Sequence, residues 1–265
     1  MSIQLSGLFV YPVKALGGVE IPTATAQPEG LDNDRRWVIV GPDGRFISQR
    51  SHPALARIKT RLQPEGLILT AAGQPPLDLR PPTGEPRRTV SIWNDEVNAA
   101  AAAPAADRWL SEFLGEPCHL AWMDPLCRRP ITSSGGREGE AVSFADGYPC
   151  LVISEASLAD LNGRLSEPVP MNRFRPNLVV SGCRSFAEDS WSTMTIGEVR
   201  LRAAGPCARC AVTTVNQETG RSQAPEPLRT LATYRNTDKG AIFGANLVVE
   251  RGGSLHLGDS VRVDI

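Results

Sequence analysis

The sequence predicts a mainly β (α+β) protein, built from a closed or nearly closed barrel and a second β-rich unit with few helices. Two observations lead to this fold class. Short runs of β-branched and aromatic residues recur along the chain between Gly, Pro, Asn and Asp, whereas segments with helical spacing are few. The 265 residues, 41% of them hydrophobic, suffice for one large domain or two modest ones.

The first hundred residues are predicted to be mostly strands. Residues 35–50, RRWVIVGPDGRFISQR, contain two β-rich runs around a Pro-Asp-Gly turn, which is typical of a hairpin. Further short strands are expected over 66–73 and 89–93, with proline-rich connectors between them. A helix is expected over 106–116, because its apolar residues recur at helical spacing and Gly115 can end it.

The second half of the chain mixes strands with two helices. Residues 131–141 form a charged, Gly/Ser-rich loop, which we interpret as a plain connector rather than a lid. Ser154 is expected to cap a helix that ends at Gly163, and a short helix is expected over 226–235. The alternating C-terminal residues predict an edge hairpin. Strands are expected over 177–182, 198–205, 210–216 and within 253–265.

Charge and composition exclude several function classes. The formal net charge of −1 offers no broad attraction to nucleic acid or to an anionic membrane, so neither is expected as a partner. No apolar run approaches the roughly 18–20 residues that span a bilayer, and the N-terminal residues lack the basic leader of a signal peptide. Six cysteines are too sparse and irregular for a disulfide framework. We expect a cytoplasmic protein.

The stretch GPCARCAVTTVNQETG at 205–220 places Cys207 and Cys210 on either side of an Ala-Arg pair. A structural zinc site needs about four ligands, but the chain has no second such pair and its three histidines are far apart in sequence. A thioredoxin-like motif opens a helix, whereas the residues after this pair favour a strand. Two cysteines in a β-turn without chemistry are the simplest interpretation of the spacing alone.

Several basic residues occur in short stretches that mix polar and apolar residues. Each alone is typical of a surface charge, but together they can surround a phosphate and donate hydrogen bonds to a planar anion. Nearby cations also favour the thiolate form of a cysteine, which binds soft metals. The residues concerned are Lys14, Arg35, Arg36, Arg175 and Arg209.

Six stretches, taken in order and spacing, resemble the MOSC-domain proteins that carry an N-terminal β-barrel domain. They are YPVKALGGVEI, GLDNDRRWVIV, FADGYPCLVISEASLADLN, NRFRPNLVVSG, FAEDSW and CARCAVTTVNQETG. The resemblance covers nearly the whole chain, and the branch it indicates is the amidoxime-reducing component with its bacterial counterparts. It implies a MOSC-associated β-barrel-like domain over 1–120, a MOSC domain over 121–265 and a cofactor cleft between them.

The resemblance also implies a mononuclear molybdenum cofactor, whose metal is bound by a pyranopterin dithiolene and by one protein cysteine. The second cysteine of the CxRC motif matches that ligand, so Cys210 is the expected metal ligand and catalytic residue. Cys207 then has no metal role and is expected to be a buried structural thiol. The residues that match cofactor-binding positions of the family are Lys14, Arg35, Asp146, Gly147, Tyr148, Arg175, Asn177, Ala208 and Arg209.

Three positions depart from the family pattern. Ala15 and Ala208 stand where the family often has serine, which removes one phosphate hydrogen bond at the first position. At the second position the backbone N–H remains as a donor. Asn216 stands where the family carries aspartate, which removes a negative charge near the cofactor.

The implied activity is that of a molybdenum-dependent oxidoreductase, which reduces small N-hydroxylated compounds such as amidoximes and hydroxylamines to amines. Electrons would come from a separate donor protein, a flavin reductase acting directly or through a small haem or iron–sulfur carrier. Asp146 is a candidate general acid, although a role in loop structure is favoured. Two alternatives stay open: a module that carries or transfers molybdenum cofactor or sulfur, as a persulfide on Cys210, without reductase turnover, and a structural β-domain without cofactor.

Overall fold

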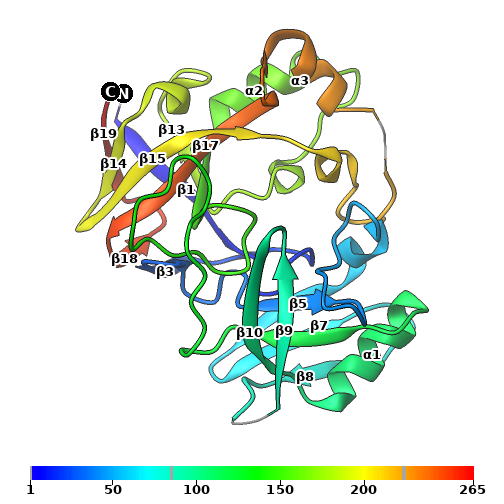
Figure 1. Cartoon of the computed structure of the whole chain (residues 1–265). Coiled ribbons are helices and arrows are strands. Elements are labelled where there is room, and N and C mark those ends of the chain that lie inside the picture. Colours follow the sequence, from blue (N-terminus) through cyan, green and yellow to red (C-terminus); the bar gives the residue numbers. More distant parts are fainter. Residues whose placement is uncertain (1, 84–85, 223–224) are drawn as a thin grey trace.

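A closed β-barrel forms the upper part of the molecule (Figure 1). The structure is a computed structural model, which describes residues 2–83, 86–222 and 225–265. The barrel strands are β1 (Ile3–Val10), β12 (Cys150–Ser154), β13 (Leu178–Ser181), β14 (Thr193–Ile196), β15 (Val199–Ala208), β17 (Gly240–Arg251) and β19 (Ser260–Asp264). They pair in the order β12-β13-β1-β19-β14-β15-β17, and β17 pairs back with β12. The predicted barrel is therefore confirmed.

Short strands extend the barrel sheet and cover one side of it. β2 (Val19–Glu20) pairs with β1, and β16 (Asn236–Thr237) pairs with β17. A separate sheet is formed by β18 (Gly253–His256), β3 (Thr23–Gln27) and β4 (Gly30–Leu31). Residues from the start of the chain thus pack with strands from its end. The predicted division at residue 120 stays a prediction.

A second β-rich unit lies below the barrel in Figure 1. One of its sheets has the order β5-β11-β10-β9 and the other has the order β6-β7-β8. Helix α1 (Pro104–Leu114) packs against them, and the three layers share a buried core with Trp37, Leu69 and Leu110 at its centre. The strands are β5 (Trp37–Val40), β6 (Lys59–Gln63), β7 (Gly66–Thr70), β8 (Leu77–Leu79), β9 (Arg87–Ile92), β10 (Asp95–Ala101) and β11 (His119–Trp122).

The helices follow the predicted capping signals. Helix α1 ends at Gly115, which takes a left-handed φ of 76°. Ser154 caps α2 (Glu155–Asn162), since its side chain accepts a hydrogen bond from the Ser157 N–H. The third helix is α3 (Leu228–Tyr234), and the short 3-10 helices are η1 (Pro53–Arg57), η2 (Met171–Arg173), η3 (Ala187–Ser190) and η4 (Ala211–Thr214). Among the described residues, no helix combines the length and the apolar composition needed to cross a membrane.

The strand predicted over 210–216 is wrong, because η4 occupies its centre. The hydroxyl of Thr213 donates to the Cys210 carbonyl oxygen at 3.0 Å, and that of Thr214 donates to the Ala211 carbonyl oxygen at 2.8 Å. Such local bonds from threonine side chains compete with the hydrogen bonding of a strand. The chain therefore turns directly after Cys210.

Of the two predicted hairpins, the one within residues 35–50 is present but short, and the C-terminal one is wrong. In the first, the Gly41 N–H donates to the Arg45 carbonyl oxygen and the Ile47 N–H to that of Ile39, around an antiparallel bridge between Val40 and Phe46. The main partner of β5 is nevertheless β11, with which it pairs along its length. At the C-terminus, β18 pairs with β3 while β19 pairs with β1 and β14, so the two do not form a hairpin. Both β5 and β19 pair mainly with strands that are distant in sequence, and a local sequence pattern does not reveal such partners.

Residues 11–16 cross from the barrel to the second unit. They directly follow β1, and a parallel bridge joins Val13 to Trp37 in β5. The Lys14 N–H then donates to the Trp37 carbonyl oxygen at 2.8 Å, which fixes the crossing segment on the second unit. A side chain on this segment is therefore held between the two parts of the molecule.

Candidate functional site

A cavity between the barrel and the second unit gathers all ten of the residues predicted for the site. Its walls come from the crossing segment, the 48–50 segment, the 145–151 loop with the start of β12, the 174–177 turn and the end of β15 with η4. The predicted residues that line it are Lys14, Arg35, Asp146, Gly147, Tyr148, Arg175, Asn177, Ala208, Arg209 and Cys210. Their spatial grouping agrees with the prediction, whereas their roles stay predictions.

Two arginines that line the cavity pack on one tyrosine. The guanidinium carbon of Arg35 lies 4.3 Å from the centre of the Tyr11 ring, and that of Arg175 lies 4.2 Å from it. We call these three residues the arginine stack. The Tyr11 hydroxyl donates to the Pro176 carbonyl oxygen at 3.0 Å. Burial raises the pKa of Tyr11 to about 12 and outweighs the opposing effect of both arginines.

Polar neighbours orient the arginine stack. Arg35 Nη1 donates to Asp34 Oδ2 at 2.6 Å and to Asn177 Oδ1 at 3.1 Å. Arg175 Nη1 donates to the Leu16 carbonyl oxygen at 2.7 Å. Asn177 is buried and also bonds two backbone groups, so its amide is fixed where it orients Arg35.

Burial opposes the positive charge of both arginines in the stack. Burial, together with the positive charge of Arg35, lowers the pKa of Arg175 to about 10. Both arginines also have left-handed backbones, with φ of 49° at Arg35 and 57° at Arg175. Such conformations cost about 1–3 kcal/mol each in non-glycine residues and gather at functional sites. The stack therefore maintains concentrated positive charge at a cost in stability, which suits an anionic ligand.

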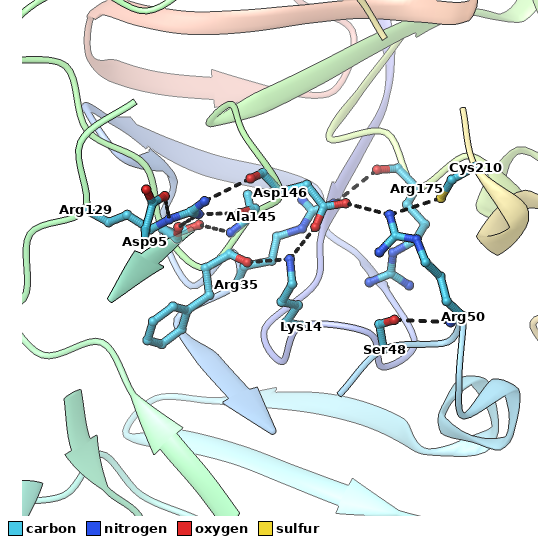
Figure 2. A network of polar contacts seen from close by, with 12 residues as sticks. Lys14, Arg35, Ser48, Arg50, Asp95, Arg129, Ala145, Asp146, Arg175 and Cys210 are labelled. Atoms are coloured by element: carbon cyan, nitrogen blue, oxygen red, sulfur yellow. Dashed lines mark hydrogen bonds and ion pairs between the residues drawn. The ribbon is translucent and has the colours of Figure 1, made fainter. Parts of the chain in front are cut away.

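Lys14 and Asp146 form an ion pair at the centre of the cavity. Lys14 Nζ donates to Asp146 Oδ1 at 2.5 Å and to the Phe144 carbonyl oxygen at 2.8 Å (Figure 2). Burial lowers the pKa of Lys14, although Asp146 opposes that shift. For Asp146, burial acts to raise the pKa, but Lys14 outweighs it and the pKa falls below its ordinary value. Asp146 is thus held as a carboxylate.

A buried arginine that the sequence reasoning missed supports this loop. Arg129 Nη1 donates to the carbonyl oxygens of Ser143 at 3.0 Å and Ala145 at 2.5 Å, and its Nη2 donates to that of Asp146 at 2.9 Å. Its Nε pairs with Asp95 Oδ2 at 2.8 Å, as Figure 2 shows. The dipeptide Arg-Arg in "LCRRP" carries no local signal for this role, because the carbonyl acceptors lie at least 14 positions away.

Tyr148 holds the 131–141 loop beside the cavity. Its hydroxyl accepts a hydrogen bond from the Gly135 N–H at 3.0 Å. Gly147 lies close to the same loop, since a Cβ atom added to it would lie 2.8 Å from Ser133 Oγ. The loop predicted as a connector is therefore anchored at the wall of the cavity by one of the predicted residues.

The two cysteines of the CxRC motif have different surroundings. Cys207 is half-buried rather than fully buried; it packs against an apolar cluster and its Sγ accepts a hydrogen bond from Arg209 Nη1 at 2.9 Å. Cys210 lies at the start of η4, and its Sγ accepts from Arg50 Nη2 at 3.3 Å. Ala208 lies between them in β15, opposite Ile242 of β17. The CxRC motif therefore brings two free thiols to the cavity, each next to a different arginine.

The side chains fit an anionic, planar group that also carries a soft metal. Lys14 and four arginines line the cavity, against the carboxylates of Asp34 and Asp146. Within the described residues, the buried Nε of Arg209 has no hydrogen-bond partner, which leaves a donor for a ligand. Across the described chain no three His, Cys, Asp or Glu side chains gather to hold a metal ion.

Comparison with known proteins relates this site to a family. Residues 2–117 match the MOSC N-terminal beta barrel domain and residues 139–262 match the MOSC domain. Human mitochondrial amidoxime-reducing component 1 is 35% identical over 96% of this chain and 81% of its own length. Rat mitochondrial amidoxime reducing component 2 is 33% identical over 97% and 82%.

Among solved structures, the YUAD protein from Bacillus subtilis aligns with 99% of this chain and 96% of its own. Its identity of 12% and TM-score of 0.44 are low, and no argument rests on this likeness. The sequence relatives are sufficient to assign the family, because they span nearly the whole chain at above 30% identity. The chain belongs to the MOSC family, with an MOSC N-terminal domain, and is similar over nearly its whole length to the mitochondrial amidoxime-reducing components.

Proposed function

We propose that this protein is a molybdenum-cofactor-dependent reductase, which converts small N-hydroxylated compounds such as amidoximes and hydroxylamines to the corresponding amines. The observation that carries the proposal is the placement of the Cys210 thiol in a cavity whose cations outnumber its carboxylates. Relatives named amidoxime-reducing components, similar over 96–97% of the chain, support the substrate class. In the reaction the N–O bond breaks, and two electrons and two protons convert the hydroxyl oxygen to water.

The chain would bind the cofactor through several residues that line the cavity. Arg35 and Arg175 supply fixed guanidinium donors for an anionic group, and Lys14 adds a further cation. The Nε of Arg209, which has no partner among the described residues, would donate to the planar part of the cofactor. Cys210 supplies the protein ligand to the metal. When bound, the cofactor would supply the two-electron chemistry that side chains cannot.

Asp146 does not serve as the general acid in this proposal. A general acid must hold a proton near neutral pH, whereas the lowered pKa of Asp146 keeps it ionised. Its carboxylate instead fixes Lys14, and its backbone is fixed by Arg129. We therefore assign Asp146 the loop-structuring role that the sequence already favoured.

Electrons would reach the site from a separate protein. An iron–sulfur cluster within the chain needs a group of cysteine ligands, and the described residues contain no such group. We propose a flavin reductase as the donor, acting directly or through a small haem or iron–sulfur carrier. The cytoplasmic location stays a prediction.

The proposal is tested by turnover of protein purified from a host that makes the cofactor. An amidoxime is supplied with a chemically reduced viologen dye, and amine formation and dye oxidation are measured together. We expect one amine for each two electrons consumed, and no product from protein grown with tungstate in place of molybdate. Molybdenum-loaded protein without amine formation would contradict the reductase. Sulfane sulfur on Cys210 in protein without stable molybdenum would favour the cofactor or sulfur carrier instead.

A further inference from the structure

Arg50 lines the cavity but has no part in the proposed binding of the cofactor. It lies in the 48–50 segment of the second unit, and its Nη2 donates to Cys210 Sγ at 3.3 Å across 160 positions of the chain. The same Nη2 lies 3.9 Å from Asp146 Oδ2. Figure 2 shows this side chain reaching from the segment around Ser48 toward the thiol. Arg50 thus connects the second unit to the expected metal ligand.

The guanidinium of Arg50 has unused donors and is more exposed than that of Arg35. Arg35 is committed to a buried carboxylate and an amide, whereas the described hydrogen bonds of Arg175 and of Arg50 each use one guanidinium nitrogen. Of the five N–H groups of Arg50, the described contacts involve only Nη2, with the thiol and at a longer distance with Asp146. Its side chain is 32% exposed, compared with 13% for Arg35. Arg50 therefore offers donors to a small molecule that enters beside Cys210.

Trp93 holds the guanidinium of Arg50 in place. The guanidinium carbon lies 4.7 Å from the centre of the Trp93 ring. This ring packs edge-on against the Phe46 ring, with 5.0 Å between the two ring centres. Trp93 is 51% exposed and has a left-handed φ of 56°, which is uncommon for a bulky residue. A guanidinium stacked on an aromatic face keeps the N–H groups at its edge available. An exposed, strained tryptophan next to a cavity arginine thus gains a physical explanation.

We infer that Arg50 binds the oxygen atom of the substrate N–O group beside Cys210, and that Trp93 is a positioning residue for Arg50. The inference rests on the proposed function and specifies the part of the substrate that the protein recognises. The hydroxyl oxygen of an amidoxime accepts hydrogen bonds, and the amine or amidine product lacks this atom. A site built to bind an oxygen discriminates strongly against the analogue without it. Arg50 would therefore favour substrate over product.

Binding without turnover tests this role directly. The dissociation constants of an aryl amidoxime and its parent amidine are measured by calorimetry on oxidised, molybdenum-loaded protein without an electron donor. A hydrogen bond from a charged donor corresponds to about tenfold to hundredfold in affinity, so the wild type should prefer the amidoxime by about that factor. Arg50→Met should lose most of this preference, and Arg50→Lys should keep part of it. Arg45→Met, at an exposed position of the same unit, is the matched control.

Substitution of Trp93 separates positioning from simple packing. Trp93→Phe keeps an aromatic face and should retain most of the preference for the amidoxime. Trp93→Leu removes the cation–π contact and should lower the preference about threefold to tenfold. Both variants should keep the molybdenum and pterin content of the wild type. Among the described residues, the ring contacts of Trp93 are with Arg50 and Phe46 and not with the arginine stack.

Three results would overturn the inference. One is an amidoxime preference that survives in Arg50→Met, and another is equal preference in Trp93→Phe and Trp93→Leu. The third is loss of molybdenum and pterin from Arg50→Met, which would make Arg50 a cofactor-binding residue. Because the binding comparison needs no turnover, it decides the role of Arg50 even if the wild type fails to reduce the amidoxime, a failure that would contradict the proposed function instead.

Discussion

Two groups of residues around the cavity are built differently. In the arginine stack Tyr11 is buried and both arginines are half-buried, and the cations are bonded to a carboxylate, an amide and backbone carbonyls. In the second group, which we call the thiol end, Cys210 is half-buried and accepts a hydrogen bond from the more exposed Arg50, and Trp93 is exposed. The first group has its geometry set by the surrounding fold, whereas the second keeps donors and a thiol available. This contrast is expected where one group binds a cofactor and the other meets substrate.

The largest effect is predicted at the thiol end. Cys210→Ser should lower turnover more than a hundredfold and remove most of the molybdenum, because a hydroxyl is a poor ligand for a soft metal. Cys207→Ser is the matched control, since this thiol also lines the cavity and lies two positions from Arg209. It should keep most of the activity. Activity and metal content are measured on both; the reverse pattern would assign the ligand to Cys207 and break the proposed contrast.

The next effect is predicted at the arginine stack and concerns stability. Arg35→Met leaves the buried Asp34 carboxylate with the Tyr11 N–H as its remaining described donor. Removing one partner of a buried ion pair costs about 3–5 kcal/mol. The free energy of unfolding, measured with urea, should fall by about this amount. Arg45→Met, whose side chain is 82% exposed, should change it by less than about 0.5 kcal/mol.

An unfolding free energy that is the same for Arg35→Met and Arg45→Met would contradict a rigid arginine stack. In that case Asp34 would have to find another hydrogen-bond donor.

The smallest effect is predicted for Tyr11→Phe. The variant loses the bond from the hydroxyl to the Pro176 carbonyl oxygen and should be less stable by about 1–2 kcal/mol at neutral pH. It keeps the aromatic face, so its molybdenum and pterin content should match the wild type. A loss of cofactor together with the hydroxyl would show that the hydroxyl, rather than the ring, supports the arginines.

The same variant predicts a change at alkaline pH. Burial raises the pKa of folded Tyr11 to about 12, while the unfolded chain titrates near its ordinary value of 10. Below pH 10 both states hold the proton and the contribution is fully present; between pH 10 and about 12 only the unfolded state releases it, so stability falls as pH rises. Tyr11→Phe should make this alkaline decline shallower, as measured by the urea midpoint. An unchanged slope would contradict the burial of the hydroxyl.

The sequence predicted one of these two groups better than the other. Lys14, Arg35, Arg175 and Arg209 stand in motifs whose order resembles a family, and the fold brings them together at the cavity. Arg50 and Trp93 were missed, because nothing in "SQRS" or "SIWN" distinguishes them from strand and turn residues. Their role depends on contacts across the two units, and Arg50 meets Cys210 from 160 positions away.

Prediction of the fold from the sequence has the same limit, because contacts between distant parts of the chain are not visible in local patterns. The barrel class and the three helices follow from local spacing and from capping residues such as Ser154 and Gly115. Strand partners do not, since β19 pairs with β1 and β14 rather than with its sequence neighbour β18. The misplaced strand after Cys210 has a local cause, because Thr213 and Thr214 bond backward to the chain as a turn requires.

The most direct test of the account is the cofactor content of the purified protein. Elemental analysis and the fluorescence of the oxidised pterin are measured together on protein from a molybdenum-replete host that makes the cofactor. We predict about one molybdenum and about one pterin per chain, and loss of both in Arg175→Ala, which removes a cation of the arginine stack. Folded wild-type protein with neither molybdenum nor pterin would contradict the cofactor site and the reductase with it.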